Sequence, residues 1–165
     1  MLNYNGDQEI LKLKKTGFLC SRHIPKNCEK RTWEWVNVHN NNACCIVTGY
    51  HSRIEKKVFR TLLKGDAKII LVLSSSVRGS LRKDVKKAVE ENRLLIISPV
   101  DTKISKPAPL TAEIRNKLIV FISDDLFIAH TRKGGLLERI ISGIEKQIRQ
   151  YRTGSENRLF LHSLN

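Results

Sequence analysis

The chain has 165 residues, of which 41% are hydrophobic and 28% are charged, values that are typical of a globular domain and argue against a disordered chain. It contains no run of roughly 20 apolar residues and no apolar core of a secretory signal near its start, so we expect a cytoplasmic protein without a membrane span. Its net charge of +14 favours a polyanionic partner over the alternative of a merely basic soluble protein.

Short apolar runs alternate with helical patterns along the whole chain. Buried strands are predicted, in chain order, at Thr16–Cys20, Cys44–Thr48, Lys68–Leu73, Leu94–Ser98 and Leu126–His130. Helices are predicted at Cys28–His39, Arg53–Lys64, Ser80–Glu91, Thr111–Ile122 and Leu136–Arg149. This alternation predicts a single-domain α/β, Rossmann-like fold, with a mostly parallel sheet and helices on both faces. We expect one domain over residues 1–165 with its core at about 16–150, and a further edge strand at Arg158–His162.

The four cysteines do not predict a metal site or a disulfide. Cys20, Cys28, Cys44 and Cys45 form no C-x-x-C pair and have no histidine at zinc-finger spacing. Cys20, Cys44 and Cys45 lie in or beside apolar runs, where a reduced cysteine acts as a small hydrophobic residue. The sequence therefore indicates no metal and no cofactor.

Ligands of open parallel sheets bind beyond the carboxyl ends of the strands, where helix N-termini offer free N–H groups to anions. Four predicted loops at these ends combine hydroxyl groups or glycines with Arg or Lys. They are Cys20–Pro25, Thr48–Arg53, Ser74–Ser80 and His130–Gly135. Together they predict a rim that holds a phosphate-bearing ligand.

The loop at Thr48–Arg53 leads directly into a helix. Gly49 would let the backbone approach a ligand, and the N–H groups of Ser52–Ile54 would point outward to an anion. A capping box of Ser52 with Glu55 explains the same residues without a ligand, and the two interpretations are compatible. His51 either donates to a phosphate or faces water, and the sequence does not separate these alternatives.

Two further motifs are open to a functional and a structural interpretation. Lys133, Gly134 and Gly135 precede the last predicted helix, where they form either a phosphate cradle or a flexible turn. Arg115 and Asn116 lie inside a helix, although asparagine is a poor helix former. Arg115 either reaches over the strand ends to an anion or is an exposed surface residue.

Basic residues cluster on one side of the Arg53–Lys64 helix, and we expect that only Glu55 could pair with them. We call this cluster the basic stripe. It consists of Lys56, Lys57, Arg60 and Lys64 together with Arg53. A second stripe of Arg82, Lys83, Lys86 and Lys87 is predicted on the next helix. Nearly one-signed faces suit a nucleic-acid backbone, whereas an ordinary solvated face mixes charges of both signs. Trp33 and Trp35 are expected in the core, so no stacking platform for bases is evident.

These residues resemble the Rossmann-like core of the DNA-processing protein A (DprA/Smf) family over about residues 16–150. Cys20-Ser21-Arg22 is similar to the family's G-S-R loop, and Thr48–Glu55 is similar to its S-G-x-A-x-G-I-D loop, with Arg53 in place of the second glycine. The most specific match is Arg115–Asp124 with the segment R-N-R-I-I-x-x-L-S-D, which accounts for Asn116. The resemblance implies binding of single-stranded DNA or a nucleotide, and it makes a homodimer plausible.

The wider superfamily includes the LOG proteins, which resemble lysine decarboxylases and hydrolyse nucleoside monophosphates. Their P-G-G-x-G-T-x-x-E motif is only partly similar here, because its glutamate position falls on Ile141 and Glu138 lies three residues earlier. The resemblance therefore favours a binding protein over an enzyme. A LOG-like nucleotide phosphoribohydrolase or N-glycosidase is the alternative, and a nucleotide-sensing domain is a third.

The resulting hypothesis is a domain that binds single-stranded nucleic acid or a nucleotide, with no catalytic residue assigned. The residues expected to contact phosphate are Ser21, Arg22, Gly49, His51, Ser52, Arg53, Arg115, Asn116, Lys133, Gly134 and Gly135. The basic stripe is expected to supply long-range attraction.

Overall fold

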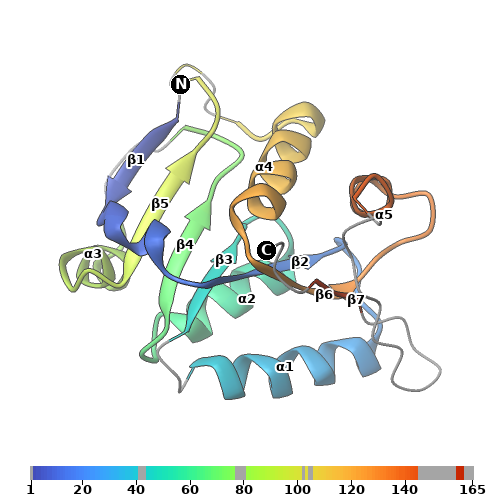
Figure 1. The fold of residues 1–165 in the computed structure, drawn as a ribbon, viewed down its shortest axis with the longest axis horizontal. Helices are drawn as coiled ribbons and strands as arrows, with labels where there is room; N and C mark the ends of the chain where they lie inside the picture. The colour runs from blue at the N-terminus through green and yellow to red at the C-terminus, as the bar shows by residue number, and fades with distance from the viewer. Residues whose placement is uncertain are drawn as a thin grey trace.

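The structure, a computed structural model, describes residues 2–40, 44–76, 81–101, 103, 106–144 and 159–161 (Figure 1). Its seven strands form one sheet in the order β1-β5-β4-β3-β2-β6-β7. The strands are β1 Asn3–Gly6, β2 Lys15–Cys20, β3 Cys45–Thr48, β4 Lys68–Val72, β5 Leu94–Ser98, β6 Asp125–His130 and β7 Leu159–Leu161. The five inner strands run parallel, whereas β1 and β7 pair antiparallel at the two edges. The predicted α/β class and mostly parallel sheet are confirmed.

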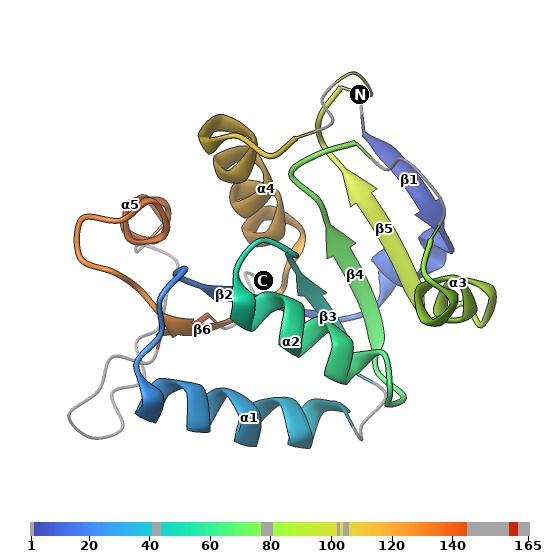
Figure 2. The same cartoon turned by 180° about the vertical axis from the view of Figure 1, so that it is seen from behind.

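Helices cover both faces of the sheet, as predicted (Figures 1 and 2). They are α1 Lys26–Asn40, α2 Arg53–Leu62, α3 Lys83–Glu90, α4 Pro109–Ile122 and α5 Leu136–Ser142, and a 3₁₀ helix, η1, spans Gln8–Lys12. One apolar cluster joins α1, α2 and α3 to the sheet, and it contains Val36, Val58 and Val85. A second cluster on the other face contains Ile10 of η1, Ile119 of α4 and Leu137 of α5. Among the described residues, no helix is long and apolar enough to cross a membrane.

Several predicted boundaries need correction. The helix predicted at Ser80–Glu91 begins at Lys83, because Arg82 is still extended; residues 77–80, which include Arg78 and Gly79 of one predicted loop, lie outside the described residues. The helix predicted to end at Lys64 ends at Leu62. The helix predicted to end at Arg149 ends at Ser142, because Gly143 forms its C-cap; residues 145–149 lie outside the described residues. The predicted edge strand near the end of the chain is present as β7.

Sequence patterns did not reveal β1 or η1, which lie outside the expected core at 16–150. The strand β1 is short and polar, so it lacks the apolar run that marks a buried strand, and it is recognisable only through its pairing with β5. Buried Ile10 of η1 packs in the second apolar cluster. The apolar core therefore begins before residue 16 and includes Ile10.

The C-terminal end of α4 is fixed tightly against β2. A Cβ atom at Gly17 would come within 2.5 Å of Ser123 Oγ, so this close approach requires glycine. Directly after it, Asp124 Oδ2 accepts a hydrogen bond from the Lys15 backbone N–H at 2.7 Å and lies 3.2 Å from Lys15 Nζ. The Ser-Asp end of the Arg115–Asp124 motif thus has a structural role, which is to fix α4 relative to the sheet.

Candidate functional site

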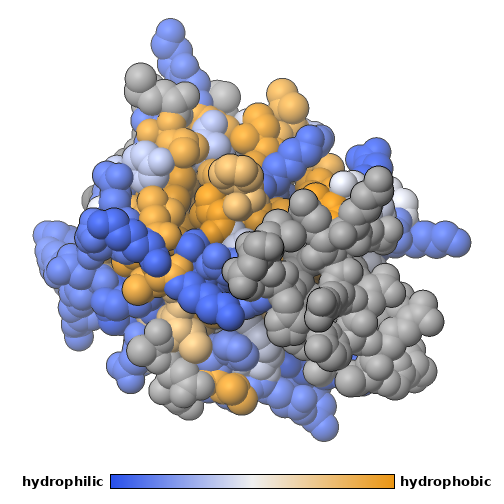
Figure 3. Space-filling model, viewed as in Figure 1, coloured by the Kyte–Doolittle hydropathy of each residue, from blue (hydrophilic) through white to orange (hydrophobic). Residues whose placement is uncertain are grey.

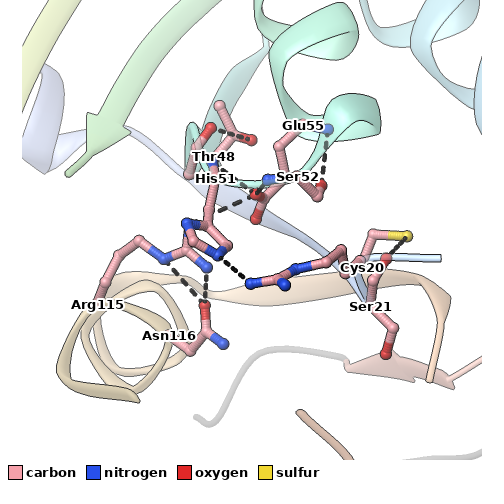
Figure 4. Close-up of polar contacts among 10 residues, drawn as sticks. Cys20, Ser21, Thr48, His51, Ser52, Glu55, Arg115 and Asn116 are labelled. Carbon is pink, nitrogen blue, oxygen red and sulfur yellow. Dashed lines mark hydrogen bonds and ion pairs between the residues drawn. The ribbon is translucent and has the colours of Figure 1, made fainter. Parts of the chain in front are cut away.

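A capping box forms the N-terminal end of α2, as predicted. Ser52 Oγ accepts a hydrogen bond from the Glu55 backbone N–H, and Glu55 Oε2 accepts hydrogen bonds from the backbone N–H groups of Ser52 at 2.7 Å and His51 at 2.8 Å (Figure 4). The prediction that the Ser52 N–H points outward to an anion is therefore wrong. The Ser52 N–H already donates to the carboxylate of Glu55 in the same helix, as it does in every capping box.

Arg115 of α4 is a buried residue, 4% exposed, and is not the surface arginine that the sequence left as an alternative. Its Nε and Nη2 atoms donate to Asn116 Oδ1 at 3.1 and 2.7 Å, and its Nη1 atom lies 3.4 Å from Glu55 Oε2. Figure 4 shows this group of side chains between α2 and α4. Because Asn116 Oδ1 accepts two hydrogen bonds from Arg115, the amide nitrogen is the part of Asn116 that can donate to a ligand.

Gly49 allows the close approach of Arg115. A Cβ atom at Gly49 would lie 2.5 Å from Arg115 Nη1 and 3.0 Å from Glu55 Oε1. Such distances are far inside van der Waals contact, so only glycine fits beside the buried ion pair. The space that the sequence assigned to a ligand at Gly49 is taken by the guanidinium group.

The ends of β2 and β6 meet in two hydrogen bonds. The Ser21 N–H donates to the His130 carbonyl at 2.9 Å, and the Arg132 N–H donates to Ser21 Oγ at 2.9 Å. The parallel register of the two strands brings these loops together at the same edge of the sheet. Ser21 therefore binds a loop of its own chain, and it positions Arg132, which the sequence did not single out as a site residue.

His51 pairs with Arg22 and has a lowered pKa. Burial lowers the pKa of His51, and the nearby cations Arg115 and Arg22 lower it further, against the opposing effect of Glu55. Arg22 Nη2 lies 3.0 Å from His51 Nε2. Because a guanidinium group only donates, Nε2 must accept and the imidazole proton must reside on Nδ1. His51 thus orients Arg22 and does not add a positive charge of its own.

These loops enclose a pocket of about 380 Å³ at the carboxyl ends of the strands. Seven of the predicted site residues line it: Ser21, Arg22, His51, Ser52, Arg115, Asn116 and Gly135. The wall also contains residues that the sequence did not assign to the site: Cys20, Glu55, Pro107, Ala108, Pro109, Ala112, Arg132, Leu136 and Leu137. The pocket lining thus combines two exposed arginines, Arg22 and Arg132, with aliphatic residues at the N-terminal ends of α4 and α5.

Four other predicted site residues are not among the described residues that line the pocket: Gly49, Arg53, Lys133 and Gly134. Gly49 lies beneath it, and exposed Arg53 points to Glu29 of α1, with Nη2 3.7 Å from the carboxylate. The Gly134 N–H, in a turn with a φ of +70°, donates to Glu138 Oε2 at 2.6 Å. The Gly134 N–H, which a phosphate cradle would need as a donor, is therefore already hydrogen-bonded to the carboxylate of Glu138.

The two basic stripes differ in the structure. In the α2 stripe, Lys57 Nζ lies 3.5 Å from Glu29, so the expectation that only Glu55 could pair with this stripe is wrong; Glu55 is buried and faces Arg115. Lys56 lies over the ring of Tyr50, whereas Arg60 and Lys64 are exposed. The α3 stripe is not one-signed, because Lys86 and Lys87 each lie 3.6 Å from a glutamate one turn later, and Arg82 pairs with Asp84.

Comparison with known proteins places these observations in context. A family model described as DNA recombination-mediator protein A matches residues 1–149. Among solved structures, the chain is similar to DNA processing protein A from Helicobacter pylori, with 18% identity and a TM-score of 0.66. That structure is described by its mode of binding single-stranded DNA. It is equally similar in fold to DNA processing protein A from Streptococcus pneumoniae, with 20% identity and a TM-score of 0.66.

These similarities cover most of this chain but less of the other proteins. The match to the Helicobacter pylori structure covers 88% of this chain and 68% of that one, and the match to the Streptococcus pneumoniae structure covers 86% and 51%. The chain thus spans about half the length of the second protein. A search of curated proteins found no match.

Proposed function

The chain belongs to the DNA recombination-mediator protein A family, and we propose that it binds single-stranded DNA, or a nucleotide unit of it, through the pocket at the carboxyl ends of β2, β3 and β6. The Helicobacter pylori relative is described by its mode of binding single-stranded DNA. We further expect the protein to act in the cytoplasm, and, as the family resemblance implies, to act as a homodimer.

The observation that carries this proposal is that two arginines, Arg22 and Arg132, line the same pocket. Both are exposed; the Arg22 guanidinium is held by His51, and the backbone N–H of Arg132 is held by Ser21. Backbone N–H groups contribute less than the sequence suggested, because Glu55 and Glu138 already accept from those of Ser52 and Gly134. A phosphate would therefore be held mainly by guanidinium groups, which bind phosphate oxygens in a fork geometry.

The remaining pocket wall suits the rest of a nucleotide. Its volume of about 380 Å³ falls within the range of small-molecule sites. Pro107, Pro109 and Leu136 offer aliphatic surface without a hydrogen-bonding group that would distinguish one base from another. Binding is thus expected to depend on the phosphate and to tolerate any base sequence.

Fluorescence anisotropy with labelled oligonucleotides tests the proposal. We expect the wild-type protein to bind single-stranded oligonucleotides of mixed sequence more tightly than the duplex of the same sequence, with affinity that falls as salt rises. Arg22→Ala and Arg132→Ala should each weaken binding at least tenfold. Lys12→Ala is the matched control, because it removes one exposed cation from η1, which precedes the amino end of β2. Equal losses of affinity in all three variants would show that only the net charge of the protein matters, and would contradict a specific site.

A further inference from the structure

The side chain of Arg22 is held by an imidazole and not by a carboxylate. Its Nη2 atom lies 3.0 Å from His51 Nε2, and the part of the chain that the structure describes gives it no carboxylate partner. Both residues line the pocket, where His51 is half-buried. A neutral imidazole leaves the charge of the guanidinium uncompensated. Arg22 is therefore available to an anion, and its departure would leave His51 Nε2 without a donor.

Charged groups from three parts of the fold face this imidazole. Arg22 belongs to the loop after β2, Arg115 belongs to α4, and Glu55 and Lys56 belong to α2. Burial has the largest effect and lowers the pKa of His51; the three cations lower it further, whereas Glu55 raises it. The carboxylate of Glu55 lies 3.4 Å from Arg115 and already compensates that cation. The unliganded pocket thus favours the neutral imidazole.

Apolar surroundings strengthen these electrostatic effects. Figure 3 shows hydrophobic side chains gathered on the side of the molecule that carries α4. The first turns of α4 and α5 add Pro109, Ala112 and Leu136 to the pocket wall. Such a wall binds little water, so charges in the pocket are screened less than charges in bulk solvent. A bound anion should therefore change the protonation of a neighbouring imidazole more than it would on an open surface.

A phosphodiester in the pocket acts on His51 in two ways. Its oxygens accept hydrogen bonds from Arg22 in which both partners are charged, and these are stronger than the bond from Arg22 to a neutral nitrogen. Its negative charge also offsets the cations that disfavour the imidazolium form. The first effect removes the donor from Nε2, and the second effect favours a proton in its place. Both effects therefore act in the same direction.

We propose that His51 takes up one proton from solvent at Nε2 when phosphate binds in the pocket, and that the new N–H donates to a phosphate oxygen. This inference rests on the proposed binding of single-stranded DNA at the same site. Nδ1 keeps its proton, so the imidazole becomes an imidazolium, and the bound pocket has one cation more than the free pocket. His51 thus changes from an acceptor for Arg22 into a donor for the ligand.

Proton uptake makes the affinity for DNA depend on pH. Between the lowered pKa of His51 in the free protein and a higher pKa in the complex, the complex binds more protons than its separate components. The affinity therefore rises as pH falls, by at most about tenfold for each pH unit when one full proton is taken up. We expect single-stranded DNA to bind at least about threefold more tightly at about pH 6 than at about pH 7.5.

Isothermal titration calorimetry counts these protons. A short oligothymidylate without a terminal phosphate is the probe, because neither its phosphodiesters nor its bases titrate near pH 6.5, the ordinary pKa of histidine. Any proton taken up is then bound by the protein. Titrations in two buffers of different ionisation enthalpy give the number of protons from the difference in observed heat.

Two variants assign the proton to a residue. His51→Gln is the test variant, since its amide oxygen can accept from Arg22 but the amide cannot be protonated. His130→Gln is the matched control. His130 is a half-buried histidine at the end of β6 whose pKa is also lowered by burial, but it is not among the described residues that line the pocket.

The wild type and His130→Gln should each take up at least about 0.3 proton per binding site, and His51→Gln should take up close to none. Binding without proton uptake by the wild type would overturn this inference and leave the proposed function intact, as would equal uptake in His51→Gln. Absence of binding at every pH would overturn the proposed function, and this inference with it. The wild-type count alone decides the proposal if circular dichroism shows that His51→Gln is unfolded.

Discussion

The carboxylate of Glu55 and the guanidinium of Arg115 lie 3.4 Å apart in the wall of the pocket, although the two residues are sixty positions apart in the chain. Their side chains are 1% and 5% exposed. This pair joins the N-terminal turn of α2 to the middle of α4, and through Asn116 it extends to the pocket wall. Glu55, which the sequence assigned to a capping box, is therefore also the counter-ion of Arg115, which the sequence assigned to phosphate binding.

Removal of either member of this pair should destabilise the fold. Glu55→Ala and Arg115→Ala each leave an uncompensated buried charge, so we expect each to lower the free energy of unfolding by about 3–5 kcal/mol. Glu55→Gln should cost less, because an amide oxygen can still accept from the backbone N–H groups of His51 and Ser52. Urea unfolding measures all three, and a change below about 1 kcal/mol in both alanine variants would contradict the role of a buried pair.

Gly49→Ala should disturb the same pair from the other side. The added Cβ atom would lie 2.5 Å from Arg115 Nη1, so the guanidinium must move and its hydrogen bonds to Asn116 must weaken. We expect a decrease of about 1–3 kcal/mol in the free energy of unfolding, the usual cost of overpacking, together with weaker oligonucleotide binding. Gly143→Ala is the matched control, because its Cβ atom would meet only backbone carbonyls at 3.4 Å or more. Equal effects of the two substitutions would argue against a close approach at Gly49.

The sequence predicted the fold because the five inner strands are short apolar runs and the helices between them have apolar faces. It could not predict β1, since Asn3-Tyr4-Asn5-Gly6 owes its extended form to pairing with β5 and has no apolar pattern of its own. The predicted edge strand at Arg158–His162 was accessible to the same reasoning because its residues are β-rich and apolar.

The candidate site was only partly predictable, for a different reason. Loop composition pointed to Ser21, Arg22 and His51, because polar and glycine-rich strand ends converge in a parallel sheet, whereas Asn116 was singled out by its place inside a helix and by the family resemblance. It could not show which donors are already occupied. Glu55 and Glu138 accept hydrogen bonds from backbone N–H groups, which depends on side-chain conformation. Arg115 is buried against Gly49, which depends on an interaction between segments far apart in the chain.

The pH dependence of stability should report on His51. Its pKa in the folded chain is lowered below the ordinary value of 6.5, chiefly by burial. Between the lowered pKa of the folded chain and the ordinary pKa of the unfolded chain, the unfolded chain therefore binds more protons than the folded one. The free energy of unfolding should therefore fall as pH falls from about 7 toward 5. His51→Gln should make this dependence shallower without abolishing it, because burial also lowers the pKa of His130. Urea unfolding at several pH values measures the slope, and an unchanged slope in the variant would exclude His51 as a contributor.

Hydrolysis of nucleoside monophosphates is not expected. The position that aligns with the glutamate of the LOG motif is Ile141, which is 2% exposed and packs in the core. The nearest carboxylate in sequence, Glu138, binds the Gly134 N–H and is not among the described residues that line the pocket. Adenine release from AMP, followed by chromatography, should stay at the background rate. Turnover that is present in the wild type and absent in Glu138→Ala would instead identify this carboxylate as part of an active site.

The α2 stripe should attract single-stranded DNA in proportion to the cations that are not engaged within the chain. Lys57 already lies near Glu29 and Lys56 near Tyr50, so Arg60 and Lys64 are the positions at which neutralisation should change binding most. We expect the double variant Arg60→Gln/Lys64→Gln to weaken binding of every sequence alike. It should also reduce the dependence of log K on log salt by up to ~0.7 for each phosphate that the variant no longer neutralises.

Lys86→Gln/Lys87→Gln is the matched control for this prediction, because it removes the same charge from lysines that each lie near a glutamate one turn later. Arg60 and Lys64 are exposed on α2 and the control pair is exposed on α3, so both double variants should unfold at nearly the wild-type urea concentration. If only the net charge of +14 attracts DNA, the two variants should lose affinity equally. A larger decrease in affinity and a shallower salt dependence in the α2 variant alone would locate the path of the strand beside α2, because counterions are released only where cations of the protein neutralise phosphates.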